Sequence, residues 1–355
     1  MEKHQEKEGF AMEKRYIVTG ANGHLGHTIV SMLADAGACV RALVYDGDAQ
    51  GVPMPQQVER VAGDVRDYAS LEALFAQDDA HENIVIHTAG IVKIASKVDE
   101  NVYAVNVQGT KNIIRGCMEN HVKRLVYVSS VHAIAEKRKG EKIEETKEFN
   151  PKRVVGAYAK TKAEATKAVL DSVAQGLDAV VVHPSGILGP GDYGHGHLTQ
   201  MVIDACRGAL RACVKGGYDF VDVRDVAYGT IQAAEKGRKG ECYILSNRYY
   251  PVPAFLNLLH TVCGYRAIKL VLTFWLAKAT APLSEWYYKL RKQPPLYTRY
   301  SLYTLQSNGW FDHSKATKEL DYHPRPMEET MADTVEFLQK QGRIPLPKGK
   351  ECRCN

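Results

Sequence analysis

Two side chains that could carry acid–base chemistry lie four positions apart in the segment Tyr158-Ala159-Lys160-Thr161-Lys162. At helical spacing, the phenol of Tyr158 and the ammonium of Lys162 share one face, one turn apart. A phenol with an unperturbed pKa of about 10 is a poor base at neutral pH, but a neighbouring ammonium lowers that pKa. The pair is therefore a candidate general acid/base for an alcohol or ketone oxygen.

A hydroxyl that could position the same oxygen comes from Ser130, which follows Ser129 at the end of an apolar run. From the end of a strand, this hydroxyl can hydrogen-bond the reacting oxygen and fix its position. A tyrosine and a lysine at helical spacing are also common on protein surfaces. The catalytic interpretation therefore depends on a cofactor site elsewhere in the chain.

A glycine turn near the start of the chain fits such a cofactor. Gly20, Gly23 and Gly26 follow an apolar run at 16–18 and precede a helical pattern that ends at Gly37. In a strand–turn–helix unit, the first glycine can turn the chain, the second admits a pyrophosphate, and the third lets the helix pack closely. The free N–H groups of the helix N-terminus favour the phosphates. The expected cofactor-binding residues of this turn are Gly20, Asn22, Gly23, His24, Leu25 and Gly26.

Strands and helices alternate around these motifs. We expect strands at 38–44, 58–62, 84–87, 124–129 and 179–182, and helices at 70–76, 101–120 and 158–174. This alternation predicts an α/β fold with a Rossmann-type, doubly wound parallel sheet. Such sheets bind ligands beyond the carboxyl ends of their strands, where the strand order reverses, and the motifs fall at that edge.

The predicted domain organisation has four parts. They are a flexible leader at 1–13, a dinucleotide-binding core at 14–183, a smaller C-terminal substrate-binding lobe at 184–342, and a flexible tail at 343–355. Late core elements at 219–246 are interleaved with the lobe. Aromatic residues concentrate between 255 and 303, which suits a lobe that closes over an apolar substrate. Charged residues and a proline interrupt 268–290, so we expect no membrane span there and leave contact with a membrane surface open.

Other strand ends are expected to contact the cofactor. The residues at these ends are Tyr45, Asp64, Val65, Thr88, Ala89 and Gly90. Asp64 can hydrogen-bond the adenine or cap the next helix, although Asp67 and Ser70 are better placed for that cap. The small residues from Thr88 onward suit a backbone that passes close to a cofactor.

Cofactor choice is usually set at the end of the second strand. There a carboxylate binds the ribose 2′-hydroxyl of NAD, or an arginine binds the 2′-phosphate of NADP. Tyr45 and Asp46 occupy this position, no basic residue follows closely, and Asp46 and Asp48 would repel a phosphate. The sequence therefore favours NAD over NADP, although Arg41 inside the strand could still reach a phosphate.

Together these residues resemble the extended short-chain dehydrogenases/reductases. The matching segments are 19–26, 63–65, 87–90, 106–110, 129–130, 158–162, 183–191 and 221–226. Within that family, Pro184–Asp192 and Leu320–Pro326 are most similar to the dihydroflavonol-reductase and 3β-hydroxysteroid-dehydrogenase branch. The resemblance implies that Ser130, Tyr158 and Lys162 form a catalytic triad, and that Lys162 also holds the nicotinamide ribose.

The resemblance also implies roles for Asn106 and for a late loop. Asn106 matches a helix position that helps a proton relay in related enzymes, or it simply stabilises its helix. His183, Pro184 and Ser185 are expected beside the cofactor.

Some residues depart from the family pattern. The reductase branch often has an arginine where this chain has Tyr45, which puts NADP preference in doubt. Sugar-nucleotide dehydratases place an acidic pair after the active-site hydroxyl, whereas Val131 and His132 follow it here, so elimination chemistry lacks its acid. His132 could touch substrate, but a loop histidine without a partner is more often solvated. His195 and His197 resemble a metal pair without a third ligand, so we predict no metal site.

Composition narrows the remaining possibilities. Basic and acidic residues are interleaved along the 355 residues and the net charge is only +5, which argues against nucleic-acid binding. Six of the eight cysteines lie singly in apolar segments and are expected to be buried, whereas Cys352 and Cys354 lie in the tail. No secretory signal opens the chain, so a cytoplasmic protein is expected. A homodimer through the helices at 101–120 and 158–174 would be typical of the family.

Three hypotheses follow. The first is an NAD(P)-dependent oxidoreductase that acts on a secondary alcohol or ketone of a large apolar substrate, flavonoid-like or steroid-like. The second is a sugar-nucleotide epimerase with the same triad, which would need cationic groups in the lobe such as Arg207, Arg211 and Lys215. The third is a non-catalytic NAD(P)-binding sensor, which has no need for Tyr158 and Lys162 together.

Overall fold

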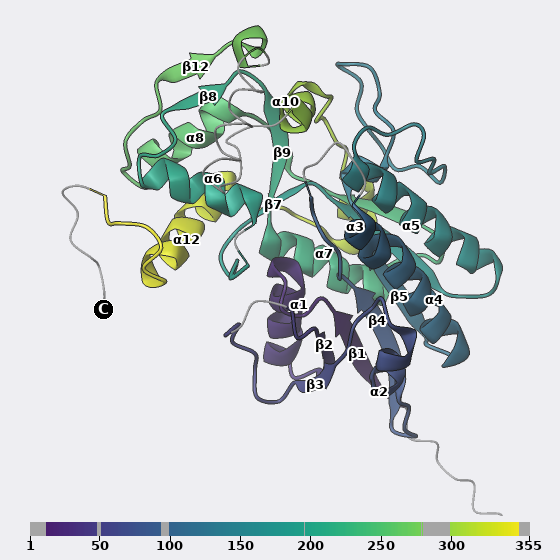
Figure 1. The fold of residues 1–355 in the computed structure, drawn as a ribbon. Helices are drawn as coiled ribbons and strands as arrows, with labels where there is room; N and C mark the ends of the chain where they lie inside the picture. The colour runs from purple at the N-terminus through teal and green to yellow at the C-terminus, as the bar shows by residue number, and fades with distance from the viewer. Residues whose placement is uncertain are drawn as a thin grey trace, which may run out of the picture.

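A parallel sheet of seven strands forms the centre of the molecule (Figure 1). The computed structural model describes residues 12–47, 51–93, 99–194, 196–277, 279 and 299–347. The strands of the sheet are β1 (Glu13–Thr19), β2 (Cys39–Val44), β3 (Glu59–Ala62), β4 (His81–His87), β5 (Arg124–Val128), β6 (Ala179–Pro184) and β10 (Cys242–Leu245). Their order is β10-β6-β5-β4-β1-β2-β3, so the order reverses between β1 and β4. This arrangement confirms the predicted doubly wound sheet.

Helices cover both faces of the sheet because its buried strands present apolar side chains on each side. On β1, Ile17 belongs to the core on one face and Val18 to the core on the other. The first core includes residues of α2 (Glu72–Phe75), α4 (Thr110–Glu119) and α5 (Ala157–Ala174). The second includes residues of α1 (His24–Asp35), α7 (Val223–Lys236) and α11 (Ser314–Leu320). In Figure 1, α4 and α5 run side by side on their face of the sheet.

A smaller lobe with its own core completes the molecule. Its strands form the order β11-β9-β7, from Arg248–Pro251, Gly217–Asp222 and Gly186–Leu188, and a pair of β8 (Ala212–Val214) with β12 (Leu270–Leu272). Its helices are α6 (His197–Cys206), α8 (Val252–Thr261), α10 (Arg299–Gln306) and α12 (Met327–Lys340). Figure 1 shows α6, α8 and α12 gathered with β8 and β12 at one end of the molecule.

Two of the aromatic residues expected to face a substrate lie inside the lobe instead. Phe255 is fully buried and stacks on Phe220 with ring centroids 4.1 Å apart, and Tyr265 is buried in the same core. These rings therefore fill the lobe rather than line a ligand site, which corrects the expectation for them. Most of the stretch 268–290 lies outside the described residues. Within the described ranges, every helix is too short or too polar to span a bilayer.

The single helix expected at 101–120 is divided into three parts. A short α3 (Glu100–Tyr103) leads through the π-helical turn η2 (Ala104–Gly109) into α4. Gly109 lets the loop after β3 approach, because a Cβ there would lie 2.7 Å from Val65 Cγ2. Asn112 then donates a hydrogen bond of 2.8 Å to the Val65 carbonyl. Wider π-helical turns of this kind often occur at functional sites, and this one carries Asn106.

Two smaller expectations also need adjustment. Four of the six cysteines expected in the core are buried, but Cys39 and Cys263 are only partly so. Ile344 is buried and the Tyr265 hydroxyl bonds the Pro345 carbonyl, so packed chain continues past residue 343. Cys352 and Cys354 lie outside the described residues.

Candidate active site

Tyr158 and Lys162 lie one turn apart at the start of α5, and both are buried. Gly156 caps the helix at φ 101°, a backbone conformation that favours glycine. The Lys162 ammonium reaches the end of β5, where Nζ donates a hydrogen bond of 2.8 Å to the Val128 carbonyl. Nζ also lies 5.0 Å from the centroid of the Tyr127 ring. The helix therefore aims both side chains at the carboxyl edge of the sheet.

Ser130 lies next to this pair, in the turn that follows β5. It is the N-cap residue of the 3₁₀ turn η3 (Val131–Ala133), and its Oγ accepts a hydrogen bond of 3.2 Å from the His132 backbone N–H. The His132 ring packs edge-on against the Tyr158 ring, with centroids 6.2 Å apart. The Ser130 carbonyl lies 3.0 Å from His183 Nδ1, which must therefore carry a proton. The structure thus brings Ser130, Tyr158 and Lys162 together.

The glycine turn is formed as the sequence predicts. Gly20 has φ +69°, and a Cβ there would lie 2.7 Å from the backbone nitrogen of Ala89. A Cβ at Gly26 would lie 2.1 Å from the Gly20 carbonyl oxygen, so only glycine lets α1 begin this close. Gly23 is the N-cap residue of α1 and has no side chain with which to cap it. The first N–H groups of α1 are left for a ligand, as a pyrophosphate site requires.

The loop after β4 connects the glycine turn to Lys162. The Thr88 hydroxyl donates to the Thr19 carbonyl at 2.7 Å, which holds this loop against the turn. At the other end of the loop, a Cβ on Gly90 would lie 3.4 Å from Lys162 Nζ and 3.3 Å from Asn106 Oδ1. The expected cofactor turn and the expected catalytic lysine therefore contact the same short loop, from its two ends.

Asn106 holds the same loop in place. Its Oδ1 accepts a hydrogen bond of 2.8 Å from the Ile91 N–H, and its Nδ2 donates to the Ile91 carbonyl at 3.0 Å. Nδ2 also lies 3.1 Å from the Thr161 hydroxyl on α5. These contacts tie the loop, the π-helical turn and α5 together.

Burial sets the protonation of the site. Loss of solvent lowers the pKa of the Lys162 ammonium to about 7. Burial likewise lowers the pKa of His183 to about 4, so its ring is neutral at pH 7. His183 Nε2 is buried and has no hydrogen-bond partner among the described residues. The N–H groups at the start of α1 can donate to phosphates, and the buried His183 Nε2 can accept a hydrogen bond, so the residues present fit a dinucleotide.

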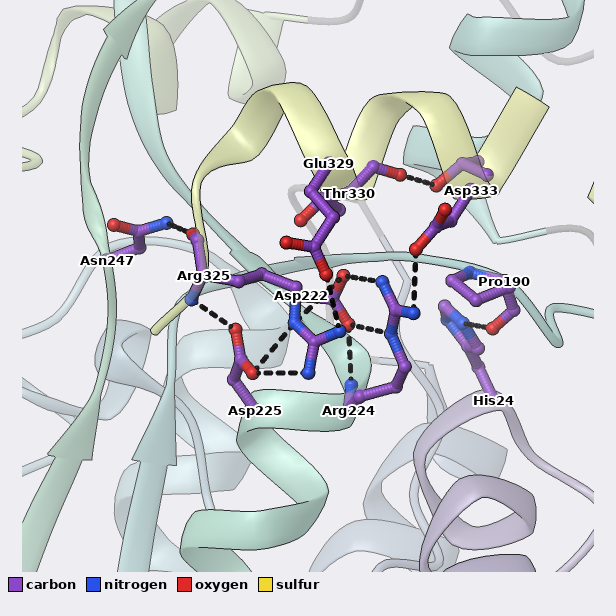
Figure 2. A network of polar contacts seen from close by, with 11 residues as sticks. His24, Pro190, Asp222, Arg224, Asp225, Asn247, Arg325, Glu329, Thr330 and Asp333 are labelled. Atoms are coloured by element: carbon purple, nitrogen blue, oxygen red, sulfur yellow. Dashed lines mark hydrogen bonds and ion pairs between the residues drawn. The ribbon is translucent and has the colours of Figure 1, made fainter. Parts of the chain in front are cut away.

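The remaining residues expected at the cofactor occupy the late strands and the loop over α1. Pro184 ends β6, and the Ser185 hydroxyl donates to the buried Asp219. His24 Nε2 lies 3.0 Å from the Pro190 carbonyl, which draws the late loop over the start of α1 (Figure 2). Burial lowers the pKa of His24.

A buried ionic network anchors the lobe beside this loop (Figure 2). Asp222 ends β9, is fully buried and caps α7 by accepting a hydrogen bond of 2.8 Å from the Arg224 N–H. The Arg224 guanidinium bonds Asp222 at 2.7 Å and reaches Asp333 on α12 at 2.7 Å. Arg325 bonds Asp225 at 2.9 Å. Burial opposes ionisation of Asp222, but the hydrogen bonds from Arg224 outweigh it and hold the Asp222 pKa below its usual value.

A pocket opens beside Ser130 and His132, between the turn after β5 and α10. Its lining includes Val131, His132, Ile134, Ile143, Tyr218, Tyr303 and Phe311, with Glu136 and Arg153 as charged members. The Tyr218 hydroxyl lies 2.8 Å from His132 Nε2, and the two rings stack with centroids 5.5 Å apart. Burial lowers the pKa of His132 to about 4. The expectation that His132 is solvated is therefore wrong, because Tyr218 on β9 covers it.

Beyond the carboxyl ends of β2 and β3, the structure adds a residue that the sequence alone does not single out. Arg66 donates to both carboxylate oxygens of Asp64 and to the hydroxyl of Tyr45 at 2.9 Å. Asp67, as expected, caps the next turn by accepting from the Ala69 N–H. The hydrogen bonds from Arg66 lower the pKa of Asp64. Arg66 is distant in sequence from the end of β2, where cofactor choice is usually set. It comes close only because β2 and β3 are neighbouring strands.

Metal ligands are not gathered in the described part of the chain. There, no three His, Cys, Asp or Glu side chains lie together as a metal requires. His197 begins α6, and His195 lies outside the described residues.

Comparison with known proteins identifies the family. A profile of the 3-beta hydroxysteroid dehydrogenase/isomerase family matches residues 17–263. The chain belongs to that family. As a member, it is similar to sterol demethylase protein B of Methylococcus capsulatus, with 30% identity over 334 residues that cover 92% of this chain and 99% of the relative. It is also similar to mouse 3 beta-hydroxysteroid dehydrogenase type 7, with 29% identity over 364 residues that cover 91% of this chain and 95% of the relative.

Solved structures share the fold of this chain. The crystal structure of gox2253 superposes on this family member with a TM-score of 0.81 at 28% identity, covering 94% of this chain and all of that one. UDP-glucose 4-epimerase of Thermus thermophilus, solved with NAD, has the same fold, with a TM-score of 0.73 at 21% identity. The match covers 92% of this chain and 99% of that one. The chain is thus an extended short-chain dehydrogenase/reductase and an NAD(P)-dependent oxidoreductase, as the motifs predicted.

Proposed function

We propose that this chain transfers hydride between NAD(P) and a secondary alcohol or ketone on a large apolar substrate, steroid-like or flavonoid-like. The observation that carries the proposal is the buried Tyr158–Lys162 pair beside Ser130, at the edge where the glycine turn begins α1. A binding module would gain nothing from a buried lysine, because desolvating an ammonium costs stability. An enzyme gains a tuned acid/base from it.

In this proposal each residue has a separate task. When bound, the cofactor supplies or accepts the hydride. The Tyr158 hydroxyl gives a proton to the substrate oxygen in reduction and takes it back in oxidation. The Lys162 ammonium stabilises the Tyr158 phenolate, and the Ser130 hydroxyl orients the substrate oxygen. Asn106 keeps Gly90 and Ile91 in register with α5 through the contacts described above.

The substrate class is inferred from the pocket and from the named relatives. Its wall beside His132 combines aliphatic and aromatic side chains, including Ile134, Tyr218 and Phe311, with polar ones, including Arg153, Ser307 and Asn308. The apolar part suits a rigid ring system, and the polar part suits oxygen substituents on that ring. Two relatives are named for sterol or steroid chemistry, which supports the same class.

The proposal is tested by replacing the Tyr158 hydroxyl alone. Tyr158→Phe keeps the ring, so we expect the protein to fold and bind cofactor while ketone reduction falls by about 10²-fold or more. Purified protein is assayed with NADH and NADPH on a panel of ketosteroids and dihydroflavonols. Cofactor binding is measured separately by fluorescence titration.

Tyr228→Phe is the matched control, because that hydroxyl lies 3.5 Å from Asp321 on the protein surface. It should retain full activity. Turnover by Tyr158→Phe equal to that of the unchanged protein would refute the mechanism. Turnover of UDP-sugars, with none on the ketone panel, would favour the epimerase instead.

A further inference from the structure

Two loops meet beyond the carboxyl ends of β2 and β3. β2 and β3 are parallel neighbours, with Val44 opposite Ala62, so the residues that follow the two strands lie side by side. Tyr45 is the first residue after β2, and Arg66 follows Asp64 in the loop after β3. This is the edge of a doubly wound sheet where the ribose 2′ position of a dinucleotide is read.

The Arg66 guanidinium is held in place from three sides. Nη2 donates to the Tyr45 hydroxyl at 2.9 Å, and the guanidinium carbon lies 5.4 Å from the centroid of the Tyr45 ring. Nη1 donates to Asn101 Oδ1 at 2.7 Å, and Nε donates to Asp64 at 2.8 Å. The side chain is nevertheless 34% exposed. A planar guanidinium that is fixed in place and still partly open to solvent is a preformed donor to a phosphate.

Other arginines on these strands bond groups away from Tyr45. Arg41 on β2 donates to Glu59 and to the carbonyl oxygens of Leu74 and Ala76, so it faces the helical layer. Arg60 on β3 donates to the Met54 carbonyl. Arg66 is thus the guanidinium that the described residues present beside Tyr45.

We propose that Arg66 binds the 2′-phosphate of NADP(H) and makes this chain prefer NADP(H) over NAD(H). The guanidinium comes from the loop after β3, whereas the residues directly after β2 lack an arginine and by themselves favour NAD. Tyr45 contributes its ring as a support and its hydroxyl as an orienting acceptor. The inference rests on the proposed function only in requiring a dinucleotide in this cleft.

Two carboxylates limit the size of the expected preference: Asp46, which is exposed beside Tyr45 and repels a phosphate, and Asp64. Asp64 pairs with Arg66 directly. Its carboxylate fixes the guanidinium but also offsets part of its charge, so one arginine faces a phosphate with a charge of about −1.5 to −2. Losing one charge-assisted contact of this kind lowers affinity by about tenfold. The contact is open to solvent, so raising the salt concentration should weaken NADP⁺ binding more than NAD⁺ binding.

The test is direct binding rather than turnover. Dissociation constants are measured by calorimetry for NADP⁺ and NAD⁺, and for 2′,5′-ADP and 5′-AMP, which differ only in the 2′-phosphate. We expect Arg66→Ala to weaken NADP⁺ and 2′,5′-ADP by about tenfold and to leave NAD⁺ and 5′-AMP within about twofold. Arg66→Lys keeps the positive charge but loses the planar guanidinium. Its affinity for NADP⁺ should lie between those of the unchanged protein and Arg66→Ala.

Arg115→Ala is the matched control. Arg115 lies 3.9 Å from the centroid of the Tyr68 ring and pairs with Glu119 on the outer side of α4, so it has the same kinds of partner away from the cleft. It should change none of the four constants. Equal weakening of NADP⁺ and NAD⁺ in Arg66→Ala, or equal affinities in the unchanged protein, would overturn the proposal. Because Tyr158 takes no part in these titrations, the result is independent of whether the chain turns over a ketone.

Discussion

The Lys162 ammonium is buried between a carbonyl oxygen and an aromatic ring, and this position gives its titration a measurable consequence. Its pKa is lowered to about 7 because burial disfavours the charged form. Lys162 is therefore protonated below pH 7 and increasingly neutral above it. In the proposed mechanism only the ammonium form stabilises the Tyr158 phenolate, so the titration of Lys162 should appear in the rate.

We expect kcat/KM for ketone reduction to fall as the pH rises through about 7, since kcat/KM reports ionisations of the free enzyme. Lys162→Arg should lower the rate but remove this alkaline decline, because a guanidinium stays charged. Lys160→Arg, an exposed neighbour on the same helix, should leave the profile unchanged. A decline that persists unaltered in Lys162→Arg would assign it to another group.

At this scale, the sequence predicts contacts that depend on spacing within one element. Tyr158 and Lys162 share a face because four helical residues bring them together, and Gly26 packs on Gly20 because the turn is short. His132 and Tyr218 meet only because β9 crosses beside the turn after β5. Arg66 reaches Tyr45 for a similar reason, since two neighbouring strands end together. Such pairs are set by the topology and have no local signature.

Among the elements, β9, α7 and α12 are joined by the network around Asp222 (Figure 2). Asp222 is fully buried, and both Arg224 and Arg325 lie within ion-pair distance of its carboxylate. A buried carboxylate of this kind is tolerated only while its partners stay in place. The network therefore couples the position of α12 to the start of α7.

Replacing Asp222 should destabilise the whole fold. Asp222→Ala removes the cap of α7 and leaves two guanidinium groups short of a partner, at a cost of about 3 kcal/mol in the free energy of unfolding. Asp171→Ala, which breaks the exposed Lys167–Asp171 pair on α5, should cost less than about 1 kcal/mol. Urea titration followed by circular dichroism measures both. Equal small losses would mean that the network contributes no net stability.

The order of the elements follows from apolar runs separated by helical patterns, and the sheet confirms it. The interruption of the helix at 101–120 does not follow from its own sequence, because it arises where Val65 approaches Gly109. The sequence likewise does not decide whether the aromatic residues of the lobe contact a ligand or fill a core. Phe255 is apolar whether it lines a ligand or fills a core, and only the position of Phe220 decides between these.

For the molecule as a whole, buried neutral histidines connect stability to pH. His87 lies between the hydroxyls of Thr19 and Thr110, at 2.7 and 3.1 Å, and burial lowers its pKa to about 3. Burial lowers the pKa of His183 to about 4. Both rings are fully buried and bridge separate elements. In the unfolded chain each would have an ordinary pKa of about 6.5.

The sign of the effect follows from counting protons. Between about pH 4 and pH 6.5 the unfolded chain binds a proton at His183 that the folded protein does not, so the free energy of unfolding falls as the solution is acidified. We expect the cofactor-free protein to lose about 1.4 kcal/mol per pH unit for each such histidine. His183→Gln removes one titrating group, so it should reduce this slope by about 1.4 kcal/mol per pH unit. His323→Gln, a change at an exposed ring, should leave the slope unchanged. The slope is obtained from urea titrations at several pH values. An unchanged slope in His183→Gln would mean that His183 is protonated in the folded protein. Acid sensitivity would then have to come from other groups, and the His183 ring beside the Ser130 carbonyl would not be neutral in the folded protein.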